Sequence, residues 1–96
     1  MRLQLLAVRD VAAEAYMRPM FVPAVGLGIR AFQDEVNRSG SDNPMYNHPA
    51  DYFLFHLGTW DDATAKFELF DQPKQLMSAT SCKTGGDDVV PLRRSN

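Results

Sequence analysis

The segment from residue 52 to residue 60 constrains the fold most, because it is crowded with large apolar side chains along its whole length. Its richness in aromatic residues is typical of a β-strand. Successive side chains of a strand point to opposite faces of the sheet, so both faces of this strand are apolar. One face takes Phe53, Phe55 and Leu57, and the other takes Tyr52, Leu54 and Trp60. Such a strand needs cover on both faces.

The residues that follow predict an antiparallel hairpin. Residues 61–65 are polar, and residues 66–70 alternate between polar and apolar side chains until Asp71-Gln72-Pro73 ends the pattern. Two strand-like runs joined by a short polar connection favour a hairpin. A short helical turn within residues 74–79 would complete this part of the chain.

The N-terminal half predicts one strand, one long connection and one helix. Residues 3–8 read as a strand, and residues 11–22, which include Pro19, read as an extended and ordered loop. Apolar residues then recur at helical spacing, at Val25, Ile29, Phe32 and Val36. The sequence therefore predicts an α+β fold: a three-stranded, mainly antiparallel sheet in the order β-loop-α-β-β, with one amphipathic helix packed on one face.

The length of 96 residues fits one small domain, which we expect over residues 1–80, followed by a flexible tail over residues 81–96. The formal net charge of -2 argues against a generally basic protein that coats nucleic acid. A single cysteine, Cys82, excludes an internal disulfide. The N-terminal apolar stretch is too short for a secretion signal, and no run is long enough for a membrane span, so we expect no membrane contact.

One helix can cover only one face of the predicted sheet. The second cover can come from the loop of residues 11–22, from Leu76 and Met77, or from another copy of the chain. We favour the loop together with a homodimer.

A glycine pattern at the start of the helix resembles a phosphate-binding motif. Gly26-Leu27-Gly28-Ile29-Arg30-Ala31 matches G-x-G-x-x-G/A, but the expected neighbouring strands do not form the βαβ unit that a dinucleotide site requires. The simpler interpretation is that these glycines let the helix pack closely on the sheet.

No arrangement of reactive residues predicts an active site. His48, His56, Asp51 and Cys82 lack the spacing of a metal site, and the adjacent carboxylate pairs diverge instead of converging. Ser78, Ser81 and Cys82 lie near the chain end without a base beside them. We therefore expect no enzyme activity, no cofactor and no metal.

A basic surface with aromatic platforms is the remaining candidate site. Arg9, Arg18 and Arg30, with Tyr16, Phe21 and Tyr46 near them in sequence, form a combination suited to single-stranded nucleic acid. The alternative is that Arg9 pairs with Asp10 or Glu14, and Arg30 with Asp34 one helical turn away.

Several local patterns together resemble one protein family. They are Leu6-Ala7-Val8-Arg9-Asp10, the run from Ala13 to Phe21, Gly28-Ile29-Arg30-Ala31-Phe32 with Asp34, the run from Tyr46 to Tyr52, Leu54-Phe55-His56-Leu57-Gly58, and Trp60-Asp61-Asp62. In this order they resemble the small nonstructural protein of gokushoviruses, which are tail-less phages with single-stranded DNA. The resemblance runs from about residue 5 to about residue 70.

The resemblance implies a non-enzymatic protein that acts in the host bacterial cytoplasm and is absent from the mature virion. It implies a role in the synthesis of the single-stranded DNA genome, through binding of that DNA or of phage or host replication proteins. An adaptor that binds a host factor and a minor capsid-assembly factor are the alternatives. The nominated surface residues, from the motifs and from the aromatic platforms, are Arg9, Asp10, Tyr16, Arg18, Pro19, Arg30, Tyr46, His48 and Asp51.

Overall fold

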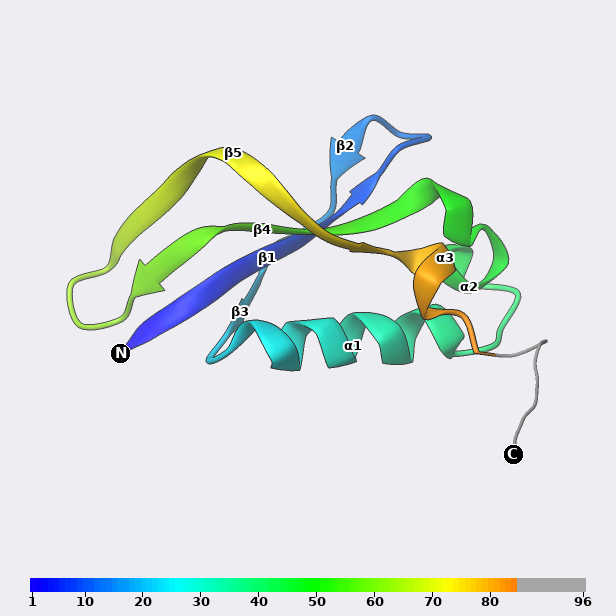
Figure 1. Ribbon diagram of the computed structural model, residues 1–96, viewed down its shortest axis with the longest axis horizontal. Coiled ribbons are helices and arrows are strands. Elements are labelled where there is room, and N and C mark those ends of the chain that lie inside the picture. The colour runs from blue at the N-terminus through cyan, green and yellow to red at the C-terminus, as the bar shows by residue number, and fades with distance from the viewer. Residues whose placement is uncertain (85–96) are drawn as a thin grey trace.

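The computed structural model describes residues 1–84 and confirms the α+β class (Figure 1). In chain order the elements are β1 (Arg2–Asp10), β2 (Ala15–Tyr16), β3 (Met20–Val22), α1 (Val25–Asn37), α2 (Pro44–Asn47), the 3-10 helix η1 (Pro49–Asp51), β4 (Tyr52–Asp61), β5 (Lys66–Ser78) and α3 (Ala79–Cys82). The strands form one antiparallel sheet in the order β2-β1-β4-β5, and β3 also pairs with β1. Helix α1 runs along one side of this sheet (Figure 1).

The sheet has five strands in the described part of the chain instead of the predicted three. The expected loop of residues 11–22 contains β2 and β3, which pair with β1 at Arg9–Tyr16 and at Leu5–Phe21. Strands of two and three residues are too short to show a periodic pattern in the sequence. Their extended backbone was predicted, and their pairing was not.

The predicted hairpin is confirmed, but β5 continues past Pro73 to Ser78. In the pairing register Gly58 lies opposite Leu69 and His56 opposite Lys74, so residues 70–73 bulge opposite a single residue of β4. Proline has no N–H for the ladder, and a bulge is a place where a strand tolerates it. The proline therefore marks a bulge in this strand and not its end.

Glycine is required at position 58, where the backbone of β5 lies very close to β4. Its φ of 153° is one that L side chains rarely adopt, and a Cβ there would overlap the carbonyl oxygen of Glu68 and lie 2.7 Å from the Cα of Leu69. Any side chain at this position would push the two strands apart.

The predicted helix is confirmed as α1, which buries Gly28, Phe32 and Val36 against the sheet. A Cβ on Gly28 would lie 2.5 Å from Cδ2 of Leu6. This close contact supports the packing interpretation of the glycine pattern, because β3 before the helix is antiparallel to β1 and forms no βαβ unit. The buried core on this side consists of Leu6, Val8, Phe32, Val36, Met45, Tyr52, Leu54, Ala79 and Cys82.

Asn43 joins the end of α1 to α2 and is almost fully buried. Its side-chain amide donates to the carbonyl oxygens of Glu35 and Arg38 at 2.7 and 2.8 Å, and its Oδ1 accepts from the backbone N–H of Met45 at 3.1 Å. One side chain thus satisfies carbonyls at the C-terminus of one helix and caps the N-terminus of the next.

The helical turn predicted within residues 74–79 is wrong, because residues 74–78 belong to β5 and the turn follows as α3. Ser78 is the N-cap of α3, and its Oγ accepts from the N–H of Ser81 at 3.2 Å. Ala79 and Cys82 are both buried, so core packing continues past the domain end expected at residue 80. The remainder of the expected tail, residues 85–96, lies outside the described residues.

Candidate interaction surface

The side of the sheet turned away from α1, which we call the open face, carries a row of apolar side chains. Paired residues share a face, and Leu6, Val8 and Leu54 pack toward α1, so the alternate positions point the other way. The open face carries Leu3, Leu5, Ala7 and Arg9 of β1, Tyr16 of β2, Phe21 of β3, Phe53, Phe55 and Trp60 of β4, and Phe67 and Leu69 of β5. The prediction that Trp60 shares a face with Leu54 is wrong, because the register shifts between His56 and Gly58 and brings Trp60 to the other face. The predicted cover from residues 11–22 is partly provided by Tyr16 and Phe21.

Three residues, Arg9, Tyr16 and Phe55, form what we call the Arg9 cluster. The guanidinium carbon of Arg9 lies 5.2 Å from the centre of the Tyr16 ring, a cation–π contact. The Tyr16 and Phe55 rings meet edge to face with their centres 5.5 Å apart. Tyr16 remains 40% exposed and Arg9 is partly buried, so the exposed part of the ring is presented to solvent with a cation against it.

A second group, Phe21, Trp60, Phe67 and Leu69, forms the hairpin apolar patch. Phe21 lies 5.3 Å from Trp60 and 6.3 Å from Phe67, measured between ring centres. Phe21, Phe67 and Leu69 are 45%, 55% and 63% exposed. The residues come from three different strands. Only Phe21 was expected at a binding surface, as an aromatic platform beside the arginines. The alternation of residues 66–70 was the signal that two apolar side chains share one face there.

The other nominated residues do not join the Arg9 cluster. Arg30 is exposed on the side of α1 away from the sheet, and Arg18 is exposed between β2 and β3. Tyr46 lies in α2, where Nζ of Lys83 sits 3.5 Å from the centre of its ring and donates to its backbone carbonyl at 3.0 Å. His48 is exposed beside it, at the start of η1. Arg9, Arg18 and Arg30 therefore form no single basic patch.

Two further nominated residues, Asp10 and Asp51, form hydrogen bonds that hold the loop after β1. The carboxylate of Asp10 accepts from the N–H of Ala13 at 3.2 Å, and the carbonyl of Asp51 accepts from the N–H of Val11 at 2.8 Å. Pro19 is exposed directly before β3. Within residues 1–84 the ion pairs do not include Arg9 with Asp10 or Glu14, nor Arg30 with Asp34.

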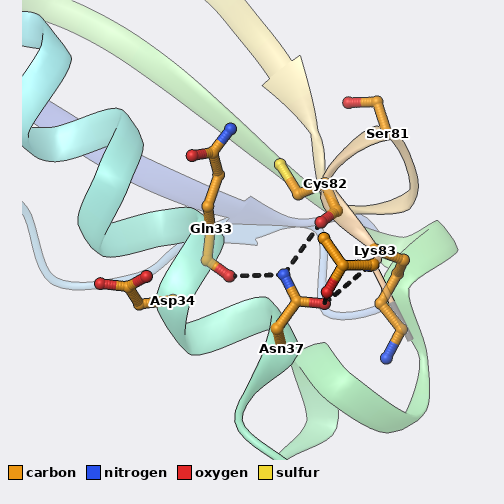
Figure 2. Close-up of a pocket in the computed structure, with 7 residues that line it drawn as sticks. Gln33, Asp34, Asn37, Ser81, Cys82 and Lys83 are labelled. Atoms are coloured by element: carbon orange, nitrogen blue, oxygen red, sulfur yellow. Dashed lines mark hydrogen bonds between the residues drawn. The ribbon is translucent and has the colours of Figure 1, made fainter. Parts of the chain in front are cut away.

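A hollow of about 500 Å³ lies between the second half of α1 and α3 (Figure 2). Asn37 lines this hollow. Its amide nitrogen donates to the carbonyls of Gln33 and Cys82, both at 2.9 Å, and its Oδ1 accepts from the N–H of Thr84 at 2.9 Å. The side chain of Asn37 is thus committed to joining α1 to the chain after α3. We interpret this contact as structural.

Cys82 lines the same hollow but is not activated as a nucleophile. Burial raises the pKa of its thiol, which lies 3.6 Å from the sulfur of Met77. A raised pKa keeps the sulfur protonated, whereas nucleophilic attack requires the thiolate. Among residues 1–84, no three His, Cys, Asp or Glu side chains gather as metal ligands, and no helix is long and apolar enough to cross a membrane.

Comparison with known proteins identifies the family. The model of the Phage ORF5 protein family matches residues 3–82, and the chain belongs to this family. No curated protein and no solved structure matches the chain. The matched range includes the whole residue span on which the sequence resemblance rests, as well as both groups of open-face residues.

Proposed function

We propose that this member of the Phage ORF5 protein family is a non-enzymatic, nonstructural accessory protein of a gokushovirus. In the proposal it binds single-stranded DNA during synthesis of the viral genome in the host cytoplasm and is absent from the virion. The Arg9 cluster is the observation that carries the proposal, because an exposed ring with a cation against it is the unit from which single-strand binding surfaces are made.

The chemistry of the cluster fits a nucleotide better than a folded protein surface. A base can stack on the exposed part of Tyr16, supported from behind by Phe55, while Arg9 meets the neighbouring phosphate. Arg9 is the one charged side chain at the paired positions of the described open face. Few phosphates are therefore neutralised, and the affinity should depend on salt only weakly.

The test is titration of a fluorescently labelled oligothymidylate with the protein, followed by anisotropy over a salt series. Because each neutralised phosphate contributes about -0.7 to the slope of log affinity against log salt, we expect a slope of about -1. Arg9→Ala should bring this slope close to zero. Tyr16→Ala should weaken binding by roughly five- to a hundredfold through loss of stacking.

Arg30→Ala is the matched control, because it removes one exposed cation from the far side of α1. It should leave both affinity and slope unchanged. Equal losses from Arg9→Ala and Arg30→Ala would contradict the placement of DNA on the open face. If the unchanged protein shows no salt-sensitive binding, the DNA part of the proposal fails. A phage or host replication protein, recovered by affinity purification from infected cells with nuclease present, would then be the partner.

A further inference from the structure

The hairpin apolar patch has no charged residue among its open-face neighbours. Leu3 pairs with Trp60, and Leu5 pairs with Phe21, so the β1 positions beneath the patch are leucines. The charged residues of the same strands alternate to the opposite face, namely Arg2, Asp61, Lys66 and Glu68. They line a separate cavity of about 170 Å³ there, in which Arg2 forms an ion pair with Glu68 at 2.9 Å.

This distribution of charge makes the patch different from the Arg9 cluster. Single-stranded nucleic acid needs cations beside the stacking rings, and the patch lacks them at its paired positions. An uncharged apolar patch can meet an identical patch across a two-fold axis, because no like charges face each other. A second copy of the chain is also the partner certain to carry an apolar patch of the same size and shape.

We propose that the hairpin apolar patch is a self-association surface on which a second copy of this chain packs its own Phe21, Trp60, Phe67 and Leu69 about a two-fold axis. The contact involves the aromatic rings of β3, β4 and β5 and leaves the Arg9 cluster exposed. It does not depend on DNA binding by that cluster.

The exposed area of the patch sets the strength of this contact. About half of Phe21, Phe67 and Leu69 is exposed, which amounts to a few hundred Å² per copy, roughly the largest apolar patch expected on a monomer. Two such patches bury less than the roughly 1,200 Å² of a stable interface, which is the range of weak and transient complexes. The dimer should therefore dissociate on dilution and form in the micromolar range.

Sedimentation velocity of the full chain over a wide concentration range tests the proposal. We expect a shift from monomer to dimer as concentration rises, with a blue shift of the Trp60 emission. Leu69→Glu should abolish the shift, because it places two carboxylates face to face across the axis. The control is Leu27→Glu, which changes a leucine of similar exposure, 51%, on the outer side of α1 and should leave association unchanged.

The outcomes separate this inference from the proposed function. A single monomeric species at every concentration would overturn it, as would a dimer that survives both Leu69→Glu and Phe67→Glu. Quenching of Trp60 by an oligonucleotide without any dimer would assign the patch to nucleic acid instead. Arg9→Ala should leave self-association intact, so failure of DNA binding and failure of the dimer are distinguishable. Thermal unfolding curves of each variant confirm that a lost dimer does not reflect a lost fold.

Discussion

The two faces of the sheet are built from the same strands but differ in how far their apolar side chains are exposed to solvent. On the face under α1, Leu54 is completely buried, whereas on the open face Leu69 of the neighbouring strand is 63% exposed. Leu6 on the same face and Val36 of α1, which packs in the same core, also have no exposed surface. Burial of apolar area is the main favourable term in folding, so the covered face carries most of the stability. On the open face Leu5 and Ala7 of β1 are buried, but the rings and the leucine above them stay 40–63% exposed at Tyr16, Phe21, Phe67 and Leu69. An exposed apolar group of this kind is typical of a recognition surface.

The largest expected contrast comes from the same substitution on each face. Leu54→Ala should lower the free energy of unfolding by about 3 kcal/mol, because it leaves a cavity in a fully buried site. Leu69→Ala should change it by less than about 0.5 kcal/mol. Urea denaturation followed by circular dichroism measures both. Similar losses would mean that the open face is buried in solution, and they would break the comparison.

A substitution of Asn43 tests how much the junction between α1 and α2 contributes to the stability of the covered face. Asn43→Ala should lower the free energy of unfolding by about 2 to 3 kcal/mol, since it removes a helix cap and leaves the carbonyls of Glu35 and Arg38 unsatisfied. The matched variant is Asn47→Ala, whose side chain is exposed and donates to Gly40 at 3.0 Å. It should lose about 0.5 kcal/mol or less by the same urea measurement. A reversed ranking would refute the capping role.

Gly58 sharpens the comparison at the point where the backbone of β5 approaches β4 closely. Gly58→Ala should cost about 2 kcal/mol, because the φ is unsuited to a side chain and a methyl group meets the backbone of β5. Gly26→Ala has the opposite sign. Gly26 lies in α1 with no atom within 4 Å of a Cβ, so alanine should stabilise the protein by about 0.5 kcal/mol. Midpoints of thermal unfolding moving in the same direction for both variants would contradict this assignment.

The smallest effect is expected at alkaline pH, from two groups in the core under α1. Burial raises the pKa of Tyr52 above its ordinary value of 10.0, with a contribution from the charge of Asp10, and burial raises the pKa of the Cys82 thiol above 9.0. The unfolded chain therefore loses these protons first. The contribution of these two groups to stability should be constant below about pH 9 and fall as pH rises through their folded-state pKa values. Urea midpoints between pH 8 and pH 11 measure this fall, and Tyr52→Phe should reduce its upper part. An unchanged slope in that variant would rule out Tyr52 as its source.

The sequence could predict the covered face because its signals are periodic. The spacing from Val25 to Val36 predicted α1, and the aromatic run of residues 52–60 predicted β4. The bulge at residues 70–73 could not be predicted in the same way, because a proline in a strand pattern normally indicates the end of a strand. The short strands β2 and β3 depend on pairing with β1, a contact between distant residues that local patterns do not contain.

The candidate site was only partly accessible from the sequence for a related reason. Arg9 and Tyr16 were nominated together, and the structure places them in contact through the β1–β2 register. Arg30 was nominated with them because it is a cation within one of the motifs of the resemblance. In the structure the helix turns it to the side of α1 away from the sheet. The hairpin apolar patch was missed, because it gathers residues from three strands, and only the register reveals that they share a face.

The connection between β3 and α1 ties the two sides of the molecule together mechanically. Phe21 stands on the open face, its neighbour Val22 packs toward the core, and α1 begins at Val25 after only Pro23 and Ala24. We expect a change in the position of Phe21 to reach the first turn of α1, because the connection is two residues long and contains a proline, which restricts the backbone. Occupancy of the open face should therefore slow amide hydrogen exchange at the start of α1, on the side of the sheet opposite the proposed contacts.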